Sequence, residues 1–124
     1  MANILVIEDD EPVREVIKAM LESRGHVVTL AVNGDAGTQQ FEQKAFDLVL
    51  CDVFMPQKEG LETMREIRQL SATVPIISMT GSGSEPDFLR IARAFGATHT
   101  IAKPFRMADL WSLVRQCLHP PGSC

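Results

Sequence analysis

The sequence predicts an α/β fold with a doubly wound, five-stranded parallel sheet and helices on both faces of that sheet. Short apolar runs alternate five times with longer stretches whose apolar residues recur at helical spacing. This alternation is typical of parallel strands joined by right-handed helical crossovers. The run at residues 48–51 is apolar without alternation, which indicates a strand buried on both faces. A chain of 124 residues is long enough for one domain with a sizeable core.

Composition excludes several classes of protein. Apolar residues make up 45% and charged residues 23% of the chain, which is ordinary for a globular domain. The net charge of −4 argues against direct binding of nucleic acid. The N-terminal apolar run at residues 4–7 is too short for a signal peptide or a membrane span. Cys51, Cys117 and Cys124 do not make a disulfide framework, so we expect a reducing, cytoplasmic location.

The first part of the chain predicts two pairs of a strand and a helix. Residues 3–7 form an apolar strand that ends in acids. The helix after it accommodates Pro12 in its first turn and ends at Gly25, as these residue types favour. Residues 27–32 form a shorter, less apolar strand, and Asn33 caps a helix that runs to about residue 44. The apolar stripe of the first helix consists of Val13, Val16, Ile17, Met20 and Leu21.

The rest of the chain predicts three further pairs. The strand at 48–51 precedes a helix that ends near Leu70, and a strand at 75–79 precedes a helix that ends at Gly96. Ser84 and Asp87 have the spacing of a capping box for that helix. A weak strand at 98–102 precedes the last helix, so we expect a domain over 1–118 and a flexible tail over 119–124. The apolar positions of these three helices are Leu61, Met64, Ile67 and Leu70, then Phe88, Ile91, Ala92 and Phe95, then Met107, Leu110, Trp111, Val114 and Leu118.

Polar residues follow four of the five expected strands. They are Glu8 and Asp9 after the first strand, Asp52 after the third, Thr80 after the fourth and Lys103 after the fifth. In open parallel sheets, ligands bind at the carboxyl ends of the strands. The second strand ends in apolar residues at 30–32, so it belongs at an edge. This placement favours the flavodoxin-like strand order 2-1-3-4-5 over the order 3-2-1-4-5.

The charges of these residues suggest a metal site and a phosphoryl acceptor. Three clustered carboxylates would repel one another, and Lys103 returns only one positive charge. A divalent cation with oxygen ligands and room for phosphate oxygens is typically Mg²⁺. An aspartate can take a phosphoryl group covalently. The hydroxyl of Thr80 and the ammonium of Lys103 are suited to its oxygens.

With these residues in place, the sequence resembles the receiver domain of bacterial two-component response regulators over about the whole chain. The resemblance implies that Asp52 accepts a phosphoryl group from the phosphohistidine of a sensor histidine kinase or a phosphotransfer protein. It implies that Thr80 and Lys103 bind the phosphoryl oxygens, and that a cis Lys103–Pro104 bond aims Lys103 into the crevice. The implied Mg²⁺ contacts are Asp9 and Asp52 directly, Glu8 through water and Phe54 through its carbonyl group. The matching segments are Glu8-Asp9, Asp52 with Met55-Pro56 and Gly60, Thr80, and Lys103-Pro104-Phe105.

The resemblance also implies a signalling module that phosphorylates itself and turns over no separate substrate. We expect a downstream protein target, no membrane partner, and a monomer or a weak dimer that depends on phosphorylation. No effector domain follows the last helix, and the chain begins with Met1. These features favour a stand-alone receiver of the chemotaxis type over a piece of a longer regulator. Two charge-assisted hydrogen bonds to a phosphoryl group would supply about 3–6 kcal/mol, against about 5.5 kcal/mol for an almost complete switch.

The sequence departs from the family pattern at three positions. Thr100 stands where the family usually has an aromatic residue, three positions before the lysine. Gly81 replaces a small alanine in a glycine-rich loop after Thr80. Phe54 stands where some relatives have a polar side chain, and it cannot hydrogen-bond an attacking water. We therefore predict a slowly hydrolysing phosphoryl group, released faster after Phe54→Asn.

Three other functions compete with this interpretation. An aspartate-dependent phosphohydrolase needs a second acid two residues after the nucleophile, where this chain has Phe54. A flavin-binding module needs a phosphate loop after the first strand, where Glu8, Asp9 and Asp10 would repel a phosphate. A receiver-like module that signals by protein contact without phosphorylation stays open because of Thr100. Asp10 and Glu11 are interpreted as acids of a first helical turn.

Overall fold

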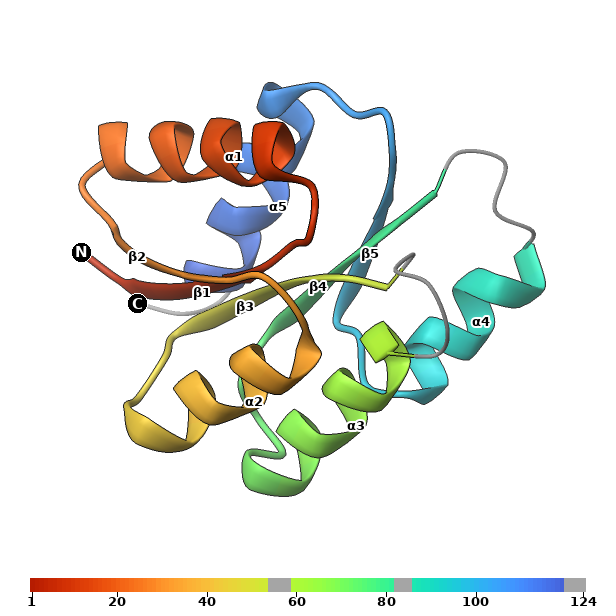
Figure 1. The fold of residues 1–124 in the computed structure, drawn as a ribbon. Coiled ribbons are helices and arrows are strands. Elements are labelled where there is room, and N and C mark those ends of the chain that lie inside the picture. The colour runs from red at the N-terminus through yellow and green to blue at the C-terminus, as the bar shows by residue number, and fades with distance from the viewer. Residues whose placement is uncertain (54–58, 82–85, 120–124) are drawn as a thin grey trace.

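The computed structural model describes residues 1–53, 59–81 and 86–119. Its centre is one sheet of five parallel strands in the order β2-β1-β3-β4-β5 (Figure 1). The predicted fold class and strand order are therefore confirmed. The strands are β1 (Asn3–Ile7), β2 (Val27–Ala31), β3 (Leu48–Asp52), β4 (Ile76–Thr80) and β5 (His99–Ala102).

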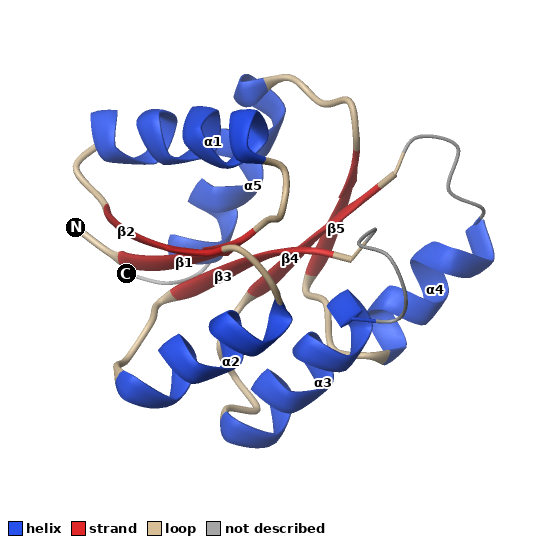
Figure 2. Ribbon diagram, in the orientation of Figure 1, coloured by secondary structure: helices blue, strands red, loops and turns tan. Residues whose placement is uncertain are grey.

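Helices cover both faces of the sheet (Figures 1 and 2). α1 (Glu11–Ser23) and α5 (Met107–Leu118) pack on one face, and their apolar side chains share a core with Ile4, Val6 and Leu50. α2 (Gly34–Gln43), α3 (Glu59–Leu70) and α4 (Pro86–Ala94) pack on the other face. Because both faces are covered, every residue of β3 and β4 is buried. None of the described helices is long and apolar enough to cross a membrane.

Several element boundaries follow the sequence prediction closely. Gly25 lies just past α1 with a φ of 87°, a left-handed conformation that favours glycine. The side chain of Asn33 accepts a hydrogen bond of 2.8 Å from the amide of Ala36, which caps α2 as expected. β2 ends one residue earlier than predicted, because Val32 is already exposed. β5 begins at His99 rather than Thr98, whose hydroxyl instead accepts from the amide of Ile76 at 3.1 Å.

The prediction for α4 is only partly confirmed. Ala92 is fully buried in the core, but Ile91 is 43% exposed and does not belong to the buried face. The predicted capping residue Ser84 lies outside the described residues, and so do the side chains of Asp87 and Phe88. Except for His119, the predicted tail also lies outside them.

The start of α3 lies against the end of β3. Gly60 has no room for a side chain, because an added Cβ would overlap the Cα of Val53 and lie 2.5 Å from the carbonyl oxygen of Asp52. Backbone atoms cannot yield as a flexible side chain does. A glycine at this position therefore lets α3 approach the strand end that carries Asp52.

Candidate functional site

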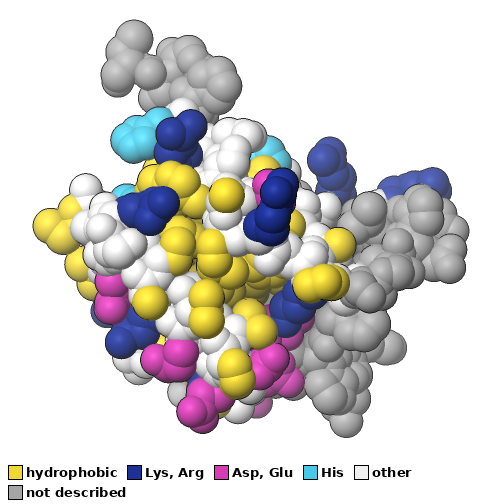
Figure 3. Space-filling view, turned by 90° about the horizontal axis from the view of Figure 1, so that it is seen from above, with side chains coloured by type: hydrophobic (Ala, Val, Ile, Leu, Met, Phe, Trp, Pro, Cys, Tyr) yellow, Lys and Arg dark blue, Asp and Glu magenta, His cyan; other side chains and the backbone are white. Residues whose placement is uncertain are grey.

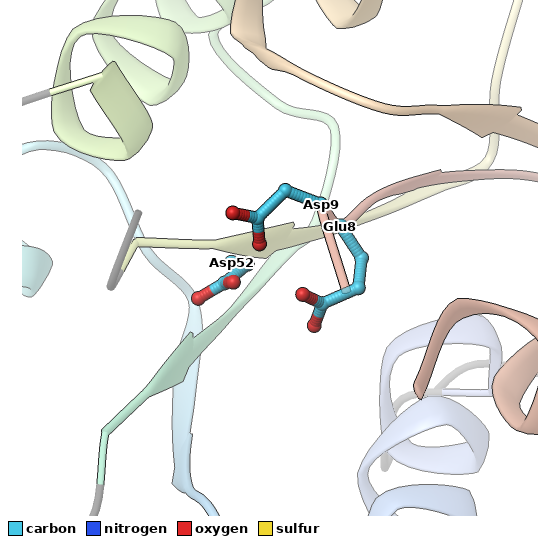
Figure 4. Close-up of side chains that lie close together, drawn as sticks. All are labelled: Glu8, Asp9 and Asp52. Carbon is cyan, nitrogen blue, oxygen red and sulfur yellow. The ribbon is translucent and has the colours of Figure 1, made fainter. Parts of the chain in front are cut away.

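Three carboxylates meet at the carboxyl ends of β1 and β3 (Figure 4). Glu8, Asp9 and Asp52 each offer an oxygen, and these oxygens all lie within 4.8 Å of one another. Glu8 and Asp52 are buried, whereas Asp9 is exposed. The structure thus brings together three of the residues singled out in the sequence. An open set of carboxylate oxygens suits a hard cation such as Mg²⁺.

Lys103 reaches the same space from the end of β5. Its Nζ donates to Glu8 Oε1 at 2.6 Å and to Asp52 Oδ2 at 3.2 Å. The Lys103–Pro104 peptide bond is cis, as the sequence resemblance suggested. The backbone amide of Lys103 donates to the carbonyl group of Thr80 at 2.7 Å, which extends the pairing of β5 with β4. Lys103 thereby joins the ends of β1, β3 and β5.

The pKa values of Glu8 and Lys103 are both raised, but for different reasons. Burial, followed by the neighbouring carboxylate of Asp52, raises the pKa of Glu8 from 4.5 to about 7. Burial alone would lower the pKa of Lys103. The hydrogen bond to Glu8 and the charge of Asp52 outweigh that effect, so the pKa of Lys103 is raised. The site therefore holds the lysine charged and disfavours the ionised form of Glu8.

The hydroxyl residues lie on β4 and β5, next to this cluster. Asp52 pairs with Met79 in the sheet, so Thr80 lies one residue further along β4. Thr80 is fully buried, and its hydroxyl donates to the carbonyl oxygen of Ile101 in a long bond of 3.4 Å. Phe54, expected to supply a carbonyl group to the metal, lies outside the described residues.

Thr100, which stands in place of an aromatic residue, is half-buried on β5. It pairs with Ser78 of β4 in the sheet. Ser78 is fully buried, and its hydroxyl has no hydrogen-bond partner among the described residues. Two small hydroxyl residues therefore lie side by side, two pairs before the strand end that carries Thr80.

Two contacts of the β1–α1 turn were not predicted from the sequence. The amide of Asp10 donates to Glu8 Oε2 at 3.1 Å. Arg14, in the first turn of α1, donates through Nη1 to the carbonyl oxygens of Glu8 at 2.9 Å and Asp9 at 3.4 Å. Helical side chains tilt toward the N-terminus of their helix. An arginine four residues after the helix cap Asp10 was therefore a usable signal.

Fold and site together define a class of protein: a small flavodoxin-like α/β domain whose acids and lysine converge at the carboxyl edge of the sheet. The model of the response regulator receiver domain family matches residues 4–115. The chain belongs to this family, whose members are phosphoacceptor signalling domains of two-component systems.

Individual relatives agree with this assignment. The chain is 33% identical to the uncharacterized transcriptional regulatory protein YkoG of Bacillus subtilis over 121 residues, which are 98% of this chain and 53% of YkoG. The chain thus spans about half the length of that relative. The structure of the chemotaxis protein CheY4 of Vibrio cholerae superposes with a TM-score of 0.88 at 27% identity, covering 95% of this chain and 99% of CheY4. A two-component response regulator from Clostridium difficile has the same fold, with a TM-score of 0.90 at 23% identity over 99% of this chain and all of the other.

Proposed function

We propose that Asp52 is the phosphoacceptor of this receiver domain. The observation that carries this proposal is the convergence of Glu8, Asp9 and Lys103 on Asp52 at one strand edge. In the proposed step, an Asp52 oxygen bonds to phosphorus while the bond from phosphorus to the donor nitrogen breaks. The donor is a phosphohistidine of a sensor kinase or phosphotransfer protein, and its ring nitrogen retains the electron pair.

The residues at the site fit a bound Mg²⁺. Glu8, Asp9 and Asp52 supply carboxylate oxygens within 4.8 Å of one another, and Phe54 is proposed to add its carbonyl group. Bound Mg²⁺ would neutralise negative charge on the phosphoryl oxygens. Lys103 and Thr80 are proposed to bind those oxygens, with the lysine charge available because its pKa is raised.

The conformational change after phosphorylation would be driven by less free energy than two entirely new hydrogen bonds would supply. Lys103 already donates to Glu8 and Asp52, so its bond to a phosphoryl oxygen replaces bonds that exist at rest. Thr80 must likewise release the carbonyl group of Ile101. The difference between the two states is therefore below the sum of about 3–6 kcal/mol for two charge-assisted bonds. We propose a modest shift toward a surface that binds a downstream protein.

A phosphorylation assay tests this function directly. The protein is incubated with acetyl phosphate and Mg²⁺, and the intact mass is measured. We expect one phosphoryl group on the parent protein, none on Asp52→Ala, and none on the parent when a chelator removes Mg²⁺. Asp10→Asn is a matched control, because it changes the acid next to Asp9, keeps the backbone amide that bonds to Glu8, and should still take the label.

The same assay separates the proposal from its alternative. If the parent protein takes no label, the chain acts as a receiver-like module that signals by protein contact without phosphorylation. The half-buried Thr100 at the position of an aromatic residue is the observation that favours this second function. Under either function, residues 1–118 are proposed to act as one domain that transforms no separate substrate.

A further inference from the structure

The three carboxylates of the site are held in place in different ways. Both oxygens of Glu8 have partners, Lys103 at 2.6 Å and the amide of Asp10 at 3.1 Å. Asp52 is buried at a strand end and accepts from Lys103. Asp9 is exposed, and among the described residues its carboxylate makes no hydrogen bond or ion pair. Its direction must therefore be fixed through the backbone.

Arg14 contacts the backbone on both sides of Asp9. Its Nη1 donates to the carbonyl oxygen of Glu8, in the peptide group before Asp9, at 2.9 Å. The same nitrogen donates to the carbonyl oxygen of Asp9, in the peptide group after it, at 3.4 Å. Peptide groups are planar, so holding both planes fixes the two backbone torsions of Asp9. These torsions set the direction of its Cα–Cβ bond.

The first turn of α1, near the acidic site, is an electrostatically unfavourable place for the positive charge of Arg14. The first turn of a helix carries a partial positive charge from its amide groups, so a cation there is disfavoured. A positive charge beside a cation site also repels the cation. The hydrogen bonds from the guanidinium group of Arg14 to two backbone carbonyl oxygens offset both unfavourable effects.

We propose that Arg14 is a positioning residue of the acidic site: it holds the two peptide groups that flank Asp9, and so directs the Asp9 carboxylate toward Glu8 and Asp52. The inference rests on the proposed Mg²⁺ site. Loss of a group that orients a metal ligand typically weakens metal affinity about 10–100-fold. The guanidinium can satisfy two acceptors at fixed geometry, which the ammonium of a lysine does less well.

The direction of the change in Mg²⁺ affinity distinguishes a positioning role of Arg14 from an effect of its charge. The variants are Arg14→Met, Arg14→Lys and the control Lys18→Met, which removes one positive charge from the same helix at an exposed ion pair with Glu22. Mg²⁺ alone is titrated by calorimetry into each folded protein. We expect about tenfold weaker binding for Arg14→Met, an intermediate loss for Arg14→Lys, and no change beyond twofold for Lys18→Met. Equal or tighter Mg²⁺ binding by Arg14→Met overturns the proposal, because loss of a charge by itself favours the cation.

A second measurement does not depend on the metal. The backbone order parameter of the Asp9 amide is measured by NMR relaxation in the metal-free parent protein and in the same variants. We expect a lower value for Arg14→Met and an unchanged value for Lys18→Met. An unchanged value for Arg14→Met means that Arg14 does not hold this turn. If the parent protein binds no Mg²⁺ while the order parameter falls as expected, the proposed metal site fails and the positioning role stands.

Discussion

The two halves of the sheet differ in how completely their polar groups are paired. In the acidic half, β1 and β3, both oxygens of Glu8 have partners and Asp52 accepts from Lys103. In the hydroxyl half, β4 and β5, the buried hydroxyl of Ser78 has no partner among the described residues, and that of Thr80 makes one long bond of 3.4 Å. The acidic half is also more deeply buried, since β5 is only half-buried from His99 to Ile101.

This difference matches two separate requirements of a phosphorylation switch. Phosphoryl transfer depends mainly on positioning and on electrostatic stabilisation, which the paired, buried carboxylates of Glu8 and Asp52 can provide. A response needs an element with two arrangements of similar free energy, which unpaired or weakly paired groups allow. Apolar side chains gather on the helical face seen in Figure 3, whose apolar hollow beside Lys103 is lined by Val13, Val16, Pro104, Phe105 and Met107.

The largest expected effect compares one core residue from each half. Leu50 on β3 is fully buried and Ile101 on β5 is half-buried. We expect Leu50→Ala to lower the free energy of unfolding by about 3 kcal/mol and Ile101→Ala by about 1 kcal/mol, because a partly exposed side chain loses less burial and leaves a smaller cavity. Urea unfolding at one pH measures both. Equal losses would show that the two halves are equally well packed.

The next effect concerns the carboxylate at the centre of the acidic half. The pKa of Glu8 is raised by burial from 4.5 to about 7. Between these values the folded protein keeps a proton that the unfolded chain has lost, so the stability falls as the pH rises. At 1.36 kcal/mol for each pKa unit, the metal-free protein should lose up to about 3 kcal/mol across this window. Urea unfolding in the presence of a chelator, repeated across these pH values, measures the slope.

Two variants show whether Glu8 causes that slope. Glu8→Gln cannot ionise, so the decline between pH 4.5 and about 7 should disappear. Glu15→Gln changes an exposed acid on α1 and keeps Glu8, so the decline should remain. A slope that survives Glu8→Gln would assign the pH dependence to another group.

The strand order was predictable because a chemical argument and a topological rule agree. Acids, a threonine and a lysine follow four of the predicted strands, and no such residue follows the strand predicted at 27–32, which placed that strand at an edge. The resting partners of Lys103 were not predictable from the residues alone. Its hydrogen bond to Glu8 joins positions 95 residues apart. The sequence predicted only that the lysine would bind phosphoryl oxygens.

The sequence prediction failed for side chains whose surroundings are formed by several segments of the chain. Ile91 has helical spacing with Ala92 and Phe95, yet it is exposed. The periodicity of apolar residues predicts which face of a helix is buried. How many residues of that face are buried depends on how the helix packs on the sheet. The role of Arg14 was missed for a similar reason, since its acceptors are backbone carbonyl groups, which every residue carries.

The smallest expected change in the free energy of unfolding is an increase for one variant and a decrease for the other. Ser78→Ala removes a buried hydroxyl without a partner among the described residues, and burying such a group costs about 1–3 kcal/mol. We therefore expect Ser78→Ala to raise the free energy of unfolding by about 1 kcal/mol. Thr98→Val removes a hydroxyl that accepts from the amide of Ile76 at 3.1 Å, so it should lower the stability by about 1 kcal/mol. Destabilisation by Ser78→Ala would mean that its hydroxyl has a partner in solution, and the two halves would then differ less in the pairing of their buried polar groups.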